Sequence, residues 1–129
     1  MKRLYLAGPI FNVADPRSWR RDVANALPPG WTAVDPLDLE DLSAGSSAHE
    51  IVHADLAAIE TCDVVLAKAV EPSWGTAMEI RFAFDHEISV ICWRPGRDSL
   101  ETVSPWLQYH CRLITSCFKE VLGFLNAQG

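Results

Sequence analysis

The sequence predicts an α/β fold: one domain over residues 1–129, built on a doubly wound, flavodoxin-like sheet of five mostly parallel strands with helices on both faces. Two observations support this prediction. Short apolar segments alternate along the chain with segments whose apolar residues recur at helical spacing. The chain has 129 residues, 49% of them hydrophobic, which is the size and composition of one ordinary globular domain.

The first strand is predicted at residues 2–7, because this apolar segment ends at Gly8-Pro9 and is suited to the centre of a sheet. A loop follows, and Asp15-Pro16 then combines a helix-capping residue with a proline at the first helical position. The helix is expected over residues 16–27. Its predicted inward-facing residues are Trp19, Val23, Ala26 and Leu27.

Residues 31–34 form a short second strand, which we expect near an edge of the sheet. The acidic connection 35–47 is long for a compact domain, so two interpretations stay open: a lid or binding loop, and a plain mobile connection. The next helix is predicted over residues 49–61. Its apolar residues at helical spacing are Ile51, Val52, Leu56 and Ile59.

The second half of the chain repeats the alternation. Strands are predicted at residues 62–69, 88–93 and 112–115. Helices are predicted from the turn at Ser73 to about His86, from Ser104-Pro105 to Tyr109, and after a cap at Ser116. The last helix is expected to bury Phe118, Val121, Leu122 and Leu125.

Composition excludes several classes of function. The net charge of −6 argues against a nucleic-acid polymer as partner, although a local pocket for a small anion is allowed. The apolar segment after Lys2-Arg3 is too short for a signal peptide, and no apolar segment is long enough to span a membrane. The four cysteines form no C-x-x-C pair, which indicates reduced thiols in a cytoplasmic protein.

No cofactor or metal is predicted. The histidines have no metal-ligand spacing, and neither G-x-G-x-x-G nor G-x-x-x-x-G-K-[ST] occurs. A flavin mononucleotide site is disfavoured because the loop after the first strand lacks a Ser/Thr-rich phosphate cradle.

The carboxyl ends of parallel strands meet at one edge of a sheet, and ligands bind there. The segments that converge at this edge are 8–12, the residues from Asp35 onward, and 71–79. Taken singly, the polar residues of interest have structural interpretations. Glu79 suits a partner for the helix dipole, Asp55 a solvated neighbour of the core, and Asp63 a strand cap.

Taken together, four segments resemble the nucleoside 2-deoxyribosyltransferase family over residues 4–125. These are Tyr5 to Phe11, Asp55 to Ile59, Asp63 to Ala67, and Gly75 to Ile80. The family includes relatives that hydrolyse nucleoside 5′-monophosphates.

The resemblance implies a mechanism like that of a retaining glycosidase. Glu79 is the expected nucleophile toward the anomeric carbon, Asp55 the acid/base partner, and Tyr5 the residue that orients Glu79. Phe11 is expected against the base, and Asp63 in support of the site. The full set of expected substrate-binding residues is Gly8, Pro9, Ile10, Phe11, Asp63, Ser73, Gly75, Met78 and Ser104.

The chain departs from the better-known transferases at Ser73, where they carry an aspartate that meets the sugar 5′-hydroxyl. A serine there is similar to the monophosphate hydrolases, in which it binds phosphate, and Arg17 or Arg20 is a possible source of positive charge. Ser104 matches a serine that those relatives supply from a neighbouring subunit, so the resemblance implies a homodimer or a larger assembly. The candidate interface residues are Trp106, Leu107 and Tyr109.

Alternatives stay open. Ser73 and Ser104 also suit ordinary helix caps, and Pro9 and Gly75-Thr76 are more like the transferases. A base-exchanging transferase is therefore the second interpretation, with a nucleoside or nucleotide still the small-molecule substrate. A non-catalytic nucleotide-binding module is the third, and the joint presence of Glu79 and Asp55 argues against it.

Overall fold

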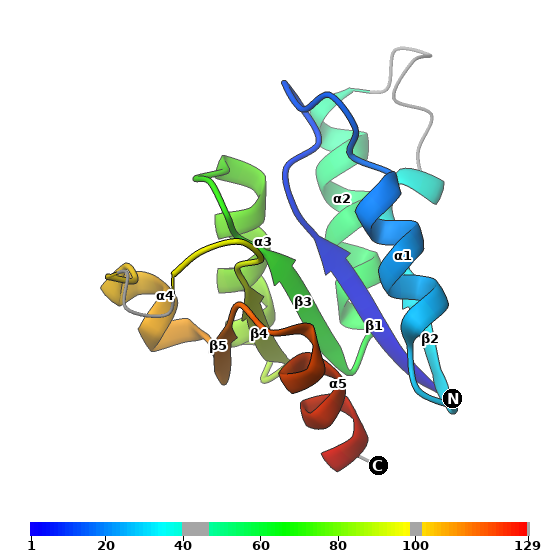
Figure 1. Cartoon of the computed structure of the whole chain (residues 1–129). Coiled ribbons are helices and arrows are strands. Elements are labelled where there is room, and N and C mark those ends of the chain that lie inside the picture. The colour runs from blue at the N-terminus through cyan, green and yellow to red at the C-terminus, as the bar shows by residue number, and fades with distance from the viewer. Residues whose placement is uncertain (40–46, 99–101, 129) are drawn as a thin grey trace.

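The computed structural model describes residues 1–39, 47–98 and 102–128. Its centre is a five-stranded parallel sheet in the order β2-β1-β3-β4-β5, which confirms the predicted doubly wound fold (Figure 1). The strands are β1 (Lys2–Ala7), β2 (Trp31–Val34), β3 (Val64–Lys68), β4 (Ser89–Trp93) and β5 (Leu113–Thr115). As predicted, β2 lies at an edge and β1 lies inside the sheet.

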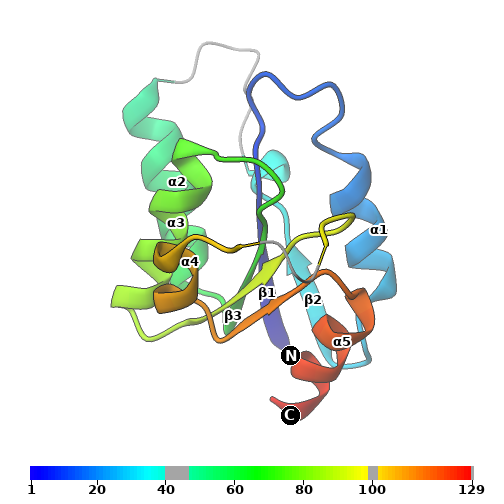
Figure 2. The same cartoon turned by 60° about the vertical axis from the view of Figure 1, so that its left-hand side comes forward.

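Helices cover both faces of this sheet. They are α1 (Ser18–Ala26), the 3₁₀ helix η1 (Pro36–Asp38), α2 (Ala48–Glu60), α3 (Trp74–Asp85), α4 (Pro105–His110) and α5 (Phe118–Ala127). Figure 2 shows α2, α3 and α4 on one face, with α1 and α5 on the other. In the described part of the chain, no helix is long and apolar enough to cross a membrane.

The two faces of β1 and β3 contribute to two separate cores. Leu4 and Leu6 pack with residues of α1 and α5, whereas Tyr5 and Ala7 pack with residues of α2 and α3. The alternation follows from the two-residue period of a strand. These central strands are apolar on both sides because helices cover both faces of a parallel sheet. Tyr5 therefore faces the α2 and α3 side.

The first helix differs from its prediction. It begins at Ser18, and the Asp15 carboxylate accepts hydrogen bonds from the backbone N–H groups of Arg17 and Ser18 at 3.1 and 3.0 Å. Asp15 therefore caps this turn as expected, but it lies three residues before Ser18, the first residue of α1. The prediction that Ala26 faces inward is wrong, since Ala26 is exposed, and Arg20 is buried instead.

Two other predictions need correction, and one of the apolar residues at helical spacing in α2 lies outside the core. This is Val52, which is 50% exposed because the buried face of α2 is narrow and centres on Ile59. Ser116 does not cap α5; Thr115 Oγ1 instead accepts a hydrogen bond from the Cys117 N–H at 2.9 Å. Glu79 lies in the second turn of α3 rather than near its first N–H groups, since α3 begins at Trp74.

The long acidic connection lies mainly outside the described residues, which exclude 40–46. Its described start contains η1, whose first turn is capped by Asp35: the carboxylate accepts a hydrogen bond from the Leu37 N–H at 2.9 Å. The two interpretations of this connection both stand as predictions.

Candidate active site

A tyrosine of the sheet and a glutamate of α3 meet at the centre of the site. The fully buried Tyr5 donates a hydrogen bond from its phenol oxygen to Glu79 Oε2 at 2.5 Å. Tyr5 comes from β1, and α3 follows β3, the strand paired with β1. Neighbouring parallel strands therefore bring together two residues that are far apart in sequence.

The protonation of Tyr5 follows from its surroundings. Burial raises the pKa of the phenol well above its ordinary value, and the negative charges of Glu79 and Asp55 raise it further. The phenol is therefore protonated throughout the neutral range and acts as a donor to Glu79. Asp55, on α2, is therefore close enough to Tyr5 for its negative charge to contribute to the raised pKa of the phenol.

A buried arginine also belongs to this environment, although the sequence indicates it only as a possible source of positive charge for a phosphate. Arg20 is 1% exposed. Its Nε, Nη1 and Nη2 donate to the carbonyl oxygens of Leu6, Pro16 and Gly8 at 3.3, 2.6 and 2.9 Å. The guanidinium is thus occupied by backbone, so the expectation that Arg20 supplies charge directly to a phosphate is not supported. A sequence signal existed: Arg20 is three residues before Val23, on the buried stripe of α1.

Gly8 allows the loop after β1 to lie against α1. A Cβ atom at Gly8 would stand 2.7 Å from Trp19 Cζ2 and 3.4 Å from Arg20 Nη2, so a larger residue would displace packed side chains. Beyond Gly8, the residues Pro9 and Ile10 are half-buried. Phe11 is 69% exposed, as a residue available for stacking on a ligand would be.

The first turn of α3 holds the other predicted residues near Glu79. Ser73 is its N-cap, and Ser73 Oγ accepts from the Thr76 N–H at 3.4 Å and contacts Thr76 Oγ1 at 3.1 Å. A Cβ at Gly75 would meet no atom within 4 Å, so packing does not require glycine there. Met78 is exposed. This turn is therefore open on its outer side.

Two predicted residues lie elsewhere. Asp63 is at the amino end of β3, where its carboxylate accepts a hydrogen bond from the Arg3 N–H at 2.8 Å. Its assignment to the substrate-binding residues is not supported, because Glu79 follows the opposite end of that strand. Ser104 is the exposed N-cap of α4 and accepts from the Trp106 N–H at 3.2 Å. Its donation to a neighbouring subunit stays a prediction.

In the part of the chain that the structure describes, no group of three or more His, Cys, Asp or Glu side chains has an arrangement that could hold a metal ion. Cys62, Cys92, Cys111 and Cys117 are all free thiols.

The sequence profile described as nucleoside 2-deoxyribosyltransferase matches residues 4–124. The chain belongs to this family. No curated protein sequence matches it. The matched range contains Tyr5, Asp55 and Glu79.

Solved structures share the fold at low sequence identity. A conserved protein from Enterococcus faecalis V583 is 18% identical with a TM-score of 0.76, and the match covers 100% of this chain and 99% of that chain. A 2-deoxyribosyltransferase from Bacillus psychrosaccharolyticus is 21% identical with a TM-score of 0.74, covering 93% and 90%. A CMP N-glycosidase from Clostridium botulinum is 22% identical with a TM-score of 0.60, covering 99% and 100%. Solved structures with this fold thus include both a transferase and a glycosidase.

If Glu79 is the nucleophile that the family resemblance implies, replacing Tyr5 by phenylalanine is expected to lower the rate of glycosidic bond cleavage about 10–100-fold while leaving the fold intact. The substitution removes one hydrogen bond to a charged group, worth about 1.5–3 kcal/mol, and keeps the buried ring. Steady-state kinetics of base release would measure it. A rate for Tyr5→Phe equal to that of the wild type would contradict an orienting role for Tyr5.

Proposed function

We propose that this protein cleaves the N-glycosidic bond of a nucleoside 5′-monophosphate or a nucleoside and releases the base to water through a covalent glycosyl-Glu79 intermediate. The observation that carries the proposal is the 2.5 Å hydrogen bond from Tyr5 to Glu79 at the carboxyl edge of the sheet, with Asp55 in the same electrostatic environment. A carboxylate nucleophile held by a buried donor, beside a second carboxyl group, is the arrangement that retaining glycosidic chemistry needs.

The proposed reaction has two steps. A Glu79 carboxylate oxygen bonds to the anomeric carbon while the bond from that carbon to the base nitrogen breaks, and Asp55 gives the departing base its proton. Water then attacks the anomeric carbon of the ester, Asp55 takes a proton from this water, and the Glu79 carboxylate leaves. The Tyr5 phenol keeps its hydrogen bond to Glu79 and limits the rotation of its carboxylate.

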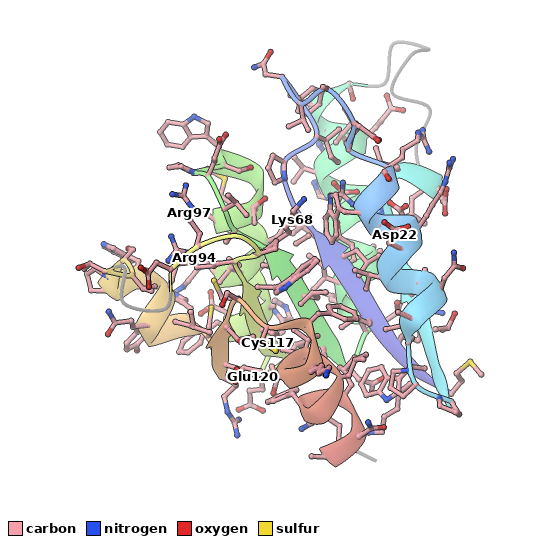
Figure 3. The ribbon with its side chains drawn as sticks, in the orientation of Figure 1. Asp22, Lys68, Arg94, Arg97, Cys117 and Glu120 are labelled. Atoms are coloured by element: carbon pink, nitrogen blue, oxygen red, sulfur yellow. The ribbon has the colours of Figure 1, made fainter. Side chains whose placement is uncertain are left out.

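Positive charge near the first turn of α3 supports an anionic substrate. Arg94 and Arg97 follow β4, whereas Lys68, at the end of β3, lies over the Trp19 ring on the α1 side of the sheet and is not part of this charge (Figure 3). Arg94 Nε and Arg97 Nη2 donate to the carbonyl oxygens of Ala69 and Val70 at 3.2 and 2.7 Å, in the loop that leads to Ser73. The positive end of a helix dipole adds to this field. A phosphate near Ser73 is therefore electrostatically favoured.

A base-exchanging transferase is the second candidate, favoured by Pro9 and Gly75-Thr76 in the family motifs. The two are separated by incubating the protein with nucleosides or with their 5′-monophosphates, each with and without a free acceptor base. We expect base release from monophosphates at a rate that the acceptor does not change. Base exchange confined to unphosphorylated nucleosides would refute the hydrolase proposal and support the transferase.

Replacing Ser73 by aspartate is expected to shift the preference from monophosphates toward nucleosides by about 10-fold or more in the ratio of kcat/KM values. A carboxylate at this cap repels phosphate, and the repulsion exceeds about 1.4 kcal/mol in a partly buried position. Aspartate is itself a good N-cap, so α3 is preserved. Competition kinetics with the two substrates would measure the shift, with Ser73→Asn as the uncharged control. An unchanged ratio would show that Ser73 only caps the helix.

A homodimer is part of the proposal, and the outer surface of α3 and α4 supports it. Trp106 and Tyr109 are 74% and 67% exposed, and with Arg81, Pro105 and His110 they line a hollow of about 310 Å³. Exposed aromatic residues in such numbers are typical of protein interfaces. The same helix begins at Ser104, so a partner docked here would be close to that serine. A purely monomeric species in analytical ultracentrifugation would exclude this arrangement.

A further inference from the structure

One guanidinium connects both ends of the loop between β1 and α1. Arg20 donates to the carbonyl oxygens of Leu6 and Gly8, where the loop begins, and to that of Pro16, where the loop ends. The loop between these contacts carries Phe11, which we expect against the base. The buried guanidinium is held in one orientation, because each of its three nitrogens donates to a different backbone oxygen.

Arg20 is also the only lysine or arginine that is buried among the residues the structure describes. Its Nε lies 3.6 Å from Asp35 Oδ1. Burial lowers the pKa of Arg20, while the negative charge of Asp35 and then that of Glu79 raise it. Tyr5 and Asp55 also raise the pKa of Arg20.

The groups whose charge acts on Arg20 come from four different parts of the fold: Tyr5 of β1, Asp35 after β2, Asp55 of α2 and Glu79 of α3. Electrostatic interaction is mutual, so the cation that is stabilised by Glu79 also stabilises the ionised Glu79. A nucleophilic carboxylate must be ionised, and a second carboxyl group close by opposes its ionisation. A fixed cation such as Arg20 offsets this repulsion between the two carboxyl groups and so favours the ionised nucleophile.

We propose that Arg20 is a positioning residue of the active site, which ties both ends of the loop 8–16 through three carbonyl oxygens and favours the ionised form of Glu79. The proposal rests on the function proposed above, because it assigns Arg20 to a site in which Glu79 is the nucleophile.

The test is a direct titration of Glu79 by carbon NMR in protein labelled with ¹³C-glutamate, with the Glu79 signal assigned by its loss in Glu79→Gln. The pKa of Glu79 is compared in wild type, Arg20→Gln and Asp35→Asn. We expect Arg20→Gln to raise it by about one pH unit, because a positive charge is lost, and Asp35→Asn to lower it, because a negative charge is lost. Asparagine keeps the acceptor that caps Leu37, so the fold around position 35 is maintained.

Opposite shifts distinguish the proposal from a purely structural role. Both substitutions disrupt the same pair of side chains, so a structural effect would move the pKa of Glu79 in the same direction or leave it unchanged in both variants. Either result would overturn the proposal. If Arg20→Gln does not fold, base release by Arg20→Lys, which keeps the charge at position 20, decides the positioning role.

Arg20→Lys separates the two contributions of Arg20. Lysine keeps the charge but lacks the fork that reaches three carbonyl oxygens. We expect the pKa of Glu79 to stay close to its wild-type value while base release falls about 10-fold, as expected of a loop that is poorly held. Wild-type rates in this variant would overturn the positioning role. The titration needs no turnover, so a wild-type protein that releases no base refutes the proposed function without affecting the titration.

Discussion

Replacing Glu79 by glutamine is expected to lower kcat/KM for base release by roughly 10³-fold or more. The substitution keeps the size of the side chain and an acceptor for the Tyr5 phenol but removes the carboxylate that forms the glycosyl ester. Base release is followed by chromatography on a panel of nucleosides and their 5′-monophosphates. The matched control is Glu120→Gln, because Glu120 is exposed on α5, on the other face of the sheet.

The covalent intermediate makes this prediction more specific. With a slowly hydrolysed substrate, wild-type protein should carry one glycosyl group on the peptide that contains Glu79, and mass spectrometry of the digested protein detects it. Equal base release by wild type and Glu79→Gln would rule out Glu79 as the nucleophile. A wild-type protein that binds these nucleotides but releases no base would instead support the non-catalytic binding module.

Replacing Arg20 by leucine is expected to lower the free energy of unfolding by about 3–5 kcal/mol. The guanidinium satisfies three backbone oxygens and lies 3.6 Å from a carboxylate that is itself mostly buried. Its removal leaves those oxygens without this donor and Asp35 without its cation. Urea unfolding followed by circular dichroism measures the change.

The neighbouring residue offers a sharp comparison. Arg21 is exposed on the same helix, so Arg21→Leu should change the free energy of unfolding by about 0.5 kcal/mol or less. The double variant Arg20→Leu/Asp35→Leu should recover part of the loss, because the uncompensated charge is then absent. Equal stability of Arg20→Leu and Arg21→Leu would show that the buried guanidinium makes no net contribution.

The strands and most helices could be predicted from local sequence. β1 and β3 are continuous apolar segments bounded by turn residues, and such segments are covered on both faces only in a parallel sheet between helices. Ser73 and Ser104 were recognisable as helix starts because a serine before the first turn satisfies N–H groups that have no partner within the helix. These features depend on neighbours within a few residues.

The pattern of inward-facing residues was less accurate where the helices are short or only partly covered. Hydrophobicity alone placed Ala26 inside, yet it is exposed, because only a narrow stripe of α1 contacts the sheet. Arg20 lies on that stripe and is buried, since the carbonyl oxygens of the preceding loop satisfy its donors. The sequence does not show which carbonyl oxygens will accept hydrogen bonds from a charged side chain, so the burial of that side chain is not expected from it.

In the candidate site too, residue types follow from the sequence, whereas the contacts between them follow from the tertiary structure. The family motifs identify Tyr5, Asp55 and Glu79 as candidates. The strand order places β1, which carries Tyr5, beside β3, which precedes the helix of Glu79. The sequence by itself determined the α/β class, the strand and helix segments and the carboxyl groups available for chemistry, because these follow from local periodicity and residue type. Only the tertiary structure decided that Tyr5 donates to Glu79, that Arg20 holds the loop 8–16, and that Asp63 lies at the other edge of the sheet. The physical reason is that each of these depends on contacts between residues far apart in sequence, whose geometry is determined by the packing of helices on the sheet.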